Sequence, residues 1–230
     1  MQLHKRDVVH AATTLLDSYG IADLTMRRLA RELDVSPGAL YWHFANKQQL
    51  LGAVADRILE PALAEQAAPT WRDDITARCE RLRDALLSHH DGAELVSASF
   101  AAGQSQAMIE LLARLATTAT SAGVAADHAD LAARTVVYYV LGFTADEQSR
   151  LQWDAAGADL PAAQSVWTQN ATDRFAFGLD LLVTGISVRL QLNSSSADAT
   201  LDAGIAVPVP QPHRIGIQDG ADPVHSEHPR

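Results

Sequence analysis

The chain has 230 residues, with 18 lysines and arginines against 28 aspartates and glutamates, and a formal net charge of −10. This length allows one large or two modest domains, each with a proper core. The single cysteine, Cys79, excludes a disulfide framework and any multi-cysteine zinc or iron–sulfur site. The overall acidity argues at first against a nucleic-acid partner, because single DNA-binding modules are usually basic.

The charge is not distributed evenly along the chain. Residues 1–47 contain six cations and five acids, so this segment carries +1 and the remainder carries −11. Both lysines, Lys5 and Lys47, fall in the first segment. The sequence therefore describes a near-neutral N-terminal head on an acidic body, and the acidity of the body does not exclude DNA binding by the head.

The sequence lacks targeting signals and enzyme motifs. No apolar core of a secretory signal and no long apolar run are present. There is no Gly-rich phosphate loop, nucleophile elbow or H-E-x-x-H. Adjacent His89 and His90 would point about 100° apart on a helix, which favours a solvated helix end over a metal pair. We expect a cytoplasmic protein that is not an enzyme, with no metal, no cofactor and no membrane partner.

The N-terminal segment predicts four short helices. Residues 5–19 place Val8, Ala12, Leu15 and Tyr19 on one inward face, and Gly20 ends the helix. The next three starts are capped by Thr25, by Ser36 followed by Pro37, and by Asn46. Asp34 and Val35 form the turn between the second and third helices, and Leu40 and Phe44 are the inward pair of the third.

The rest of the chain is also helical, and the predicted fold class is all-α. Thr70 caps a helix that runs to about Ser88 and is broken at Asp91-Gly92; further helices cover roughly 104–120, 126–150 and 162–191. Residues 193–230 are rich in Pro, Ser, Asp and Gly and predict a disordered tail, although Ile205–Val209 and Ile215–Ile217 could dock on the body. The predicted domains are a head at 1–47, a body at 48–192 and the tail at 193–230.

The segment 24–51 carries the functional signal, because helix, short turn and helix is the geometry of a helix-turn-helix motif. Gly38 and Ala39 are small enough to let the backbone approach base edges. Tyr41, Trp42 and His43 are consecutive aromatics that cannot all point inward, and exposed aromatics favour a covering partner. The alternative is that they are ordinary core and surface aromatics.

Residues 1–51 resemble the DNA-binding domain of TetR-family transcriptional repressors. The matching residues are Gly20-Ile21, Leu24-Thr25, Arg27, Leu29-Ala30, Leu33, Val35-Ser36, Leu40 to Phe44, Asn46-Lys47 and Leu50-Leu51. The resemblance continues more weakly into the body. There, 84–95 is similar to a ligand-domain helix and turn, and 139–148 and 175–190 are similar to two dimerisation helices. It leaves the tail unexplained.

The resemblance implies a set of DNA contacts. Arg27 would contact a base or groove from the second helix, and Pro37, Gly38 and Ala39 would sit over base edges. Phosphates would be contacted by Thr25, Tyr41, His43 and Lys47. Trp42 would stabilise the recognition helix and touch the DNA backbone.

The resemblance also implies an effector site in the body, although several residues of this chain differ from those of the tetracycline-responsive members of the family. Two histidines, an asparagine and a phenylalanine of tetracycline-responsive members are matched here by Val96, Leu63, Arg78 and Leu82. Losing the imidazoles implies a different effector, bound without metal. The candidate polar lining residues are Arg78, His89, Ser97, Gln104, Gln106, Tyr138 and Thr144. Arg78 could equally pair with Asp74, and Tyr138 could be packing.

These observations predict a ligand-responsive repressor. A homodimer would bind a palindromic operator of double-stranded DNA and would be released by a small-molecule effector. The alternatives are an activator of the same fold and a helical binding module without DNA activity.

Overall fold

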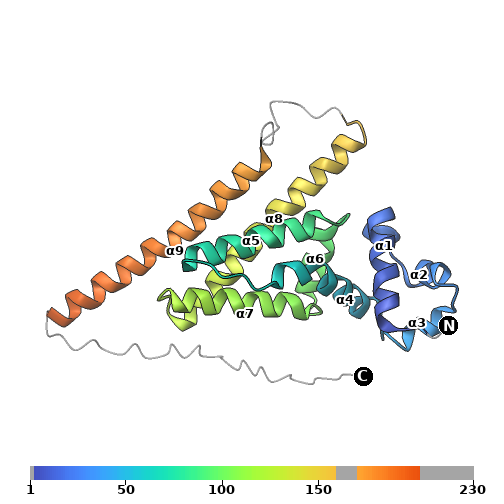
Figure 1. Cartoon of the computed structure of the whole chain (residues 1–230), viewed down its shortest axis with the longest axis horizontal. Helices are drawn as coiled ribbons and strands as arrows, with labels where there is room; N and C mark the ends of the chain where they lie inside the picture. The colour runs from blue at the N-terminus through green and yellow to red at the C-terminus, as the bar shows by residue number, and fades with distance from the viewer. Residues whose placement is uncertain (1–2, 159–169, 203–230) are drawn as a thin grey trace, which may run out of the picture. The chain divides into compact units, whose positions relative to one another are not determined.

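A computed structural model describes residues 3–158 and 170–202, and every regular element in those ranges is a helix (Figure 1). The described residues up to 192 belong to one compact unit. No helix among them is both long and apolar enough to cross a membrane. The predicted all-α class is confirmed, with α1 Lys5–Asp23, α2 Met26–Glu32, α3 Pro37–Tyr41, α4 Lys47–Leu59, a 3-10 turn Glu60–Leu63, α5 Trp71–Leu87, α6 Gly92–Ala101, α7 Gln106–Ser121, α8 Ala126–Ala155 and α9 Ala171–Asp202.

The first helix is interrupted where the glycine predicted its end. Gly20 has φ 77° and ψ 175°, a conformation in which side chains are strained, and a short helical turn follows to Asp23. Of the four residues predicted to share one face of this helix, Val8, Ala12 and Leu15 are buried but Tyr19 is not. Its ring is 53% exposed and is covered from outside by the Arg28 guanidinium, 3.8 Å from the ring centre.

Three helix starts are fixed by side-chain caps, as predicted. Thr25 Oγ1 accepts from the Arg28 amide at 3.1 Å, Ser36 Oγ from the Ala39 amide at 3.3 Å, and Asn46 Oδ1 from the Gln49 amide at 2.9 Å. Each bond satisfies an amide that the first turn leaves without a helical partner. These local bonds set the directions of α2, α3 and α4 before any long-range packing is considered.

The body is braced by one buried amide side chain. Gln148 of α8 accepts from the Ala93 amide of α6 at 2.9 Å and donates to the Leu86 and His89 carbonyls, at 2.9 and 2.8 Å. The sequence predicted the break at Asp91-Gly92 but not the helix α6 that begins there. Asp91 adopts a left-handed φ of 54°, and the chain re-enters a helix at once.

Helix α9 packs one of its sides on α8. The Tyr139 hydroxyl donates to the Phe175 carbonyl at 2.9 Å, and the two rings stack with centroids 5.6 Å apart. Helix α9 continues to Asp202, past the position 193 where the change in composition predicted a tail. The remainder of that predicted tail and residues 162–169 of the predicted 162–191 helix lie outside the described residues.

The core of the body contains an ion pair and the single thiol. Arg83 donates from Nε and Nη2 to Glu147 at 2.9 and 2.6 Å, joining α5 to α8. Cys79 is 1% exposed and packs as a small hydrophobe, and burial raises the pKa of its thiol to about 12.

Helix α4 approaches the chain between α6 and α7 so closely that only glycine fits at position 52. A Cβ there would overlap the backbone carbonyl of Gln104. We expect Gly52→Ala to lower the free energy of unfolding by about 1–3 kcal/mol, because one backbone must shift. Gly142→Ala is the matched control: a Cβ there has no neighbour within 4 Å, so we expect no loss of stability and up to about 1 kcal/mol of gain. Denaturant titration of both variants measures this, and equal stabilities would contradict the close approach.

Candidate nucleic-acid interface and effector site

Helices α2 and α3 form a helix-turn-helix unit, and one side of the second helix packs into the core of the head. The turn is closed by the Val35 amide, which donates to the Ala30 carbonyl at 2.9 Å. Leu40 and Phe44 are completely or almost completely buried, and the Lys5 ammonium lies 4.9 Å from the centre of the Phe44 ring. The inward pair predicted for this helix is confirmed, and its opposite side is left for solvent or a partner.

The predicted DNA-contacting residues lie at the start of α2, on or directly after α3, and at the start of α4. Tyr41 is 51% and Trp42 91% exposed. The expectation that Trp42 stabilises the recognition helix is wrong for the free chain, because a side chain this exposed packs on almost nothing. The remaining members are exposed (Thr25, Arg27, Pro37, Gly38) or partly buried (Ala39, His43, Lys47).

The cations of α2 have different surroundings. Arg28 is held by Asp23 at 2.5 Å and by the Tyr19 ring, whereas Arg27 is exposed beside a hollow of about 410 Å³. Arg31 lines the same hollow. It was not among the predicted contacts, although its spacing of four residues from Arg27 places it on the same helix face.

The predicted effector residues are not brought together in one cavity. Leu82, Val96 and Thr144 are completely buried, and Arg78 is 8% exposed. Leu63 lines a hollow beside Lys5 and Gln106, while Tyr138 lies 57% exposed against the Phe100 ring. The other two face neighbouring helices: His89 pairs with Asp17 of α1, and Gln104 lies against Gly52 of α4.

Arg78 forms the ion pair that its spacing from Asp74 made an alternative to effector binding. Its Nε lies 3.0 and 2.9 Å from the two Asp74 carboxylate oxygens. Burial raises the pKa of Asp74, but hydrogen bonds from Arg78 and Thr118 and the charges of Arg78 and Arg81 outweigh burial and leave that pKa below its ordinary value. Asp74 is therefore ionised at neutral pH.

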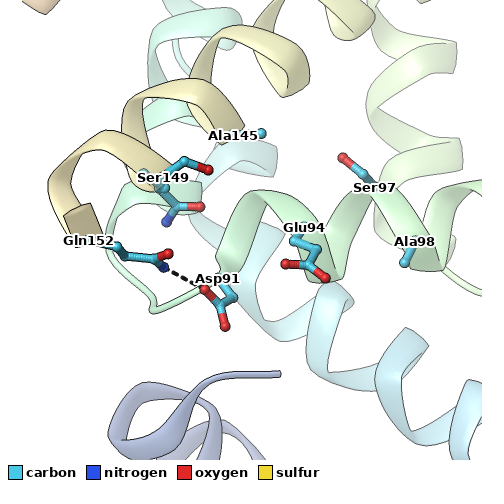
Figure 2. A pocket seen from close by; sticks show the side chains of 8 residues that line it. Asp91, Glu94, Ser97, Ala98, Ala145, Ser149 and Gln152 are labelled. Atoms are coloured by element: carbon cyan, nitrogen blue, oxygen red, sulfur yellow. Dashed lines mark hydrogen bonds between the residues drawn. The ribbon is translucent and has the colours of Figure 1, made fainter. Parts of the chain in front are cut away.

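A hollow of about 440 Å³ lies between α6 and α8 (Figure 2). Asp91, Glu94 and Ser97 line it from α6 and its start, and Ser149 and Gln152 line it from α8. A second hollow of about 350 Å³ shares Ser97 and contains Tyr138. These two spaces place Ser97 and Tyr138 near one another, but none of the other predicted effector residues.

Asp91 connects this hollow to the N-terminal head. One carboxylate oxygen accepts from Gln152 at 2.6 Å and the other from the Ile21 amide at 2.8 Å, next to the break at Gly20 (Figure 2 shows the first bond). Beside it, His89 Nδ1 lies 3.0 Å from Asp17 of α1. The place of Asp91 before Gly92 predicted only a turn, and no local pattern indicated its bond to the Ile21 amide.

Within the described ranges no cluster of three or more histidine, cysteine or acidic side chains could hold a metal ion. The head geometry defines the class of the protein: a helix-turn-helix DNA-binding protein with a helical body. Residues 8–54 match the family model of bacterial regulatory proteins of the tetR family, and residues 63–160 match the tetracyclin repressor-like C-terminal domain. The chain belongs to the tetR family of transcriptional regulators.

Individual relatives agree over most of the chain. The tetracycline repressor protein class E of Escherichia coli is 31% identical over 198 residues, which cover 80% of this chain and 90% of that protein. The crystal structure of Mycobacterium smegmatis BioQ is 62% identical, covers 81% of this chain and 99% of its own, and has a TM-score of 0.75. A structure of BioQ with its natural double-stranded DNA operator is 60% identical, with coverage of 80% and 98% and a TM-score of 0.70.

Removal of the Asp91 carboxylate is expected to loosen the end of α1. A hydrogen bond to a charged acceptor contributes about 1.5–3 kcal/mol. In Asp91→Ala we therefore expect the Ile21 amide to exchange its hydrogen more than about tenfold faster. Glu94→Ala, one turn along the same hollow, is the control and should leave that amide unchanged. Hydrogen–deuterium exchange of the peptide around residue 21 measures both, and an unchanged rate in Asp91→Ala would refute the connection.

Proposed function

We propose that this protein is a repressor that binds a palindromic operator of double-stranded DNA as a homodimer and is released by a small molecule. Residues 1–47 would bind DNA, and 48–192 would bind the effector and the second subunit; the division at 193 stays part of the proposal. The single observation that carries it is the exposure of Tyr41 and Trp42 on a capped, well-supported α3. Such aromatic surface is costly in a free protein and suits a partner.

The operator complex of BioQ supports the DNA part of this proposal, because that protein is 60% identical over most of this chain. In the proposed complex, Pro37, Gly38 and Ala39 lie over base edges and Arg27 reaches the groove. Phosphates are contacted by Thr25, Tyr41, His43 and Lys47, and the DNA backbone by Trp42. Because DNA is in the cytoplasm, we place the protein there.

The apolar outer side of α9 supports a homodimer. Phe177, Leu181 and Val188 are 67%, 58% and 48% exposed, whereas Phe175, Leu179 and Val183 of the same helix are buried in the subunit. A helix with apolar residues on opposite sides needs cover on both. A second copy of the chain would supply it and would pair two heads for two operator half-sites.

The effector part rests on the body. An effector can release DNA only if it prefers a geometry of the dimer that fits the operator poorly. The bond from Asp91 to the Ile21 amide is a route by which a change beside α6 would move the head. A structure of an Acinetobacter baumannii TetR variant in complex with minocycline, 30% identical with a TM-score of 0.66, supports this part, because that related protein binds a small molecule. An activator would use the same surfaces, and the distinction lies in the position of the operator.

The recognition surface is tested by Trp42→Ala. We expect binding to DNA from the protein's own upstream region to weaken at least about tenfold, because contacts to the DNA are lost, while the melting temperature stays unchanged because the side chain is exposed. Fluorescence anisotropy at several salt concentrations is the measurement, with Ile109→Ala, an exposed apolar residue of α7, as control. Equal affinity of Trp42→Ala and the unmodified protein would contradict the assigned surface.

The dimer is tested on α9. The double variant Phe177→Glu/Leu181→Glu would place charge on the exposed apolar side, so we expect a monomer in analytical ultracentrifugation and loss of operator binding, since each head alone makes too few contacts. Ile109→Glu introduces the same charge on α7 and should leave the dimer intact. A double variant that sediments as the unmodified protein would exclude this face as the interface.

A further inference from the structure

Helix α5 carries two arginines whose positive charges both act on Asp74, although only Arg78 is bonded to it. Arg78 and Arg81 are three residues apart and therefore lie on the same side of the helix. Arg78 Nε pairs with Asp74 at 2.9 Å, and the Thr118 hydroxyl of α7 donates to the same carboxylate at 2.6 Å. Both guanidinium groups act electrostatically on Asp74. Two positive charges, one of them on the buried Arg78 and the other on the half-buried Arg81, thus act on one negative charge.

Three nitrogen atoms of these two groups are buried and have no hydrogen-bond partner: Arg78 Nη1, Arg81 Nε and Arg81 Nη2. Native proteins satisfy nearly all buried donors, so such a set points to a further ligand. The remaining end of Arg81 donates to Gln66 at 2.7 Å, through Nη1. Within the described ranges, Arg81 has no carboxylate partner.

The arrangement of these donors matches a carboxylate. The Nε and Nη2 atoms of a guanidinium carry two parallel N–H bonds that fit the two oxygens of a carboxylate. Arg83, two residues further along α5, uses this edge: its Nε and Nη2 donate to the two oxygens of Glu147 at 2.9 and 2.6 Å. Arg81 presents the same edge, buried, to no acceptor among the described residues.

We propose that the Nε–Nη2 edge of Arg81, assisted by Arg78 Nη1, binds the carboxylate of a small-molecule acid within the helical body. The acid brings the second negative charge, so that two guanidinium groups face two carboxylates. Water alone would satisfy the buried donors but leave a surplus positive charge in a half-buried place, which is unfavourable. That this acid is the effector rests on the function proposed above.

The first test measures stabilisation by carboxylates. Saturated monocarboxylates from acetate to decanoate are compared with their uncharged primary amides in thermal unfolding of the full chain, at constant ionic strength. We expect at least one acid to raise the melting temperature saturably while its amide does not, because only the acid supplies two charged acceptors. Equal responses to acids and amides, no response to any acid, or a response to inorganic phosphate alone would overturn the proposal.

Variants separate binding from a structural role. Arg81→Met keeps the length of the side chain and leaves the Asp74–Arg78 pair intact, so we expect the free protein to melt at the same or a higher temperature and to bind the acid at least about tenfold more weakly. Arg81→Lys keeps the charge but loses the parallel N–H pair and should also bind more weakly. Arg72→Met, an exposed arginine at the start of α5, is the control. A strongly destabilised Arg81→Met that binds the acid normally would make Arg81 purely structural.

Nuclear magnetic resonance reads the Arg81 edge directly. In protein labelled with ¹⁵N at arginine Nε, we expect the Arg81 Nε–H signal to move downfield when the stabilising acid is added. The Arg83 signal, already bonded to Glu147, should stay in place. A downfield Arg81 signal before any acid is added would show that another carboxylate of the chain fills the edge, and would overturn the proposal.

Operator binding separates this site from the proposed function. If the acid is the effector, it weakens DNA binding of the unmodified protein and not of Arg81→Met. An acid that shifts the Arg81 signal but leaves DNA binding unchanged would support the site and refute its effector role. A protein that binds no operator would refute the proposed repressor, while the melting and resonance measurements would still decide the carboxylate site.

Discussion

The amide of Gln148, inside α8, holds the end of α5 and the start of α6 at one point, and this contact sets how the three helices meet. It occupies the Leu86 and His89 carbonyls at the end of α5 and the Ala93 amide at the start of α6. The two carbonyls also accept from the His89 and Gly92 amides, so Gln148 adds a second bond to each of them and supplies an acceptor for the Ala93 amide. The tight passage from α5 to α6 is therefore supported both by local backbone bonds and by this side chain from α8.

The brace has a second effect, because it fixes where Asp91 stands. With the chain pinned on both sides of it, the carboxylate reaches the Ile21 amide at the break in α1. The head is thus attached to the body at a place where its own helix is already interrupted by Gly20. Because both sides of this contact are closely packed, a displacement of Asp91 would also displace the end of α1.

Local chemistry explains why much of the head could be predicted from the sequence. Thr25, Ser36 and Asn46 act within three residues of themselves, so their caps are readable without knowing the fold. The start of α6 and the role of Asp91 depend on Gln148, more than fifty residues away, and no local pattern reports it. Tyr19 was misplaced for the same reason, because Arg28 of the next helix offers its ring a partner outside the core.

The candidate effector site was the least predictable part. Correspondence with relatives identified positions such as Val96 and Leu63, but it could not show that these side chains lie in different surroundings. Arg78 was named and its ion pair anticipated, whereas Arg81 drew no attention. What sets Arg81 apart is the donors that its neighbours fail to satisfy, and only a three-dimensional arrangement shows that.

The depth of Cys79 has a consequence for how the protein meets oxidants and alkylating agents. A thiol reacts as its thiolate, and a pKa near 12 leaves almost none of that form at neutral pH. The sulfur is also closed to reagents by its neighbours in the core. Chemical modification of the thiol therefore requires a transient opening of the body. The labelling rate of the thiol then measures how often such openings occur. The lone cysteine therefore reports on transient openings of the body, and oxidants would reach its sulfur only during such openings.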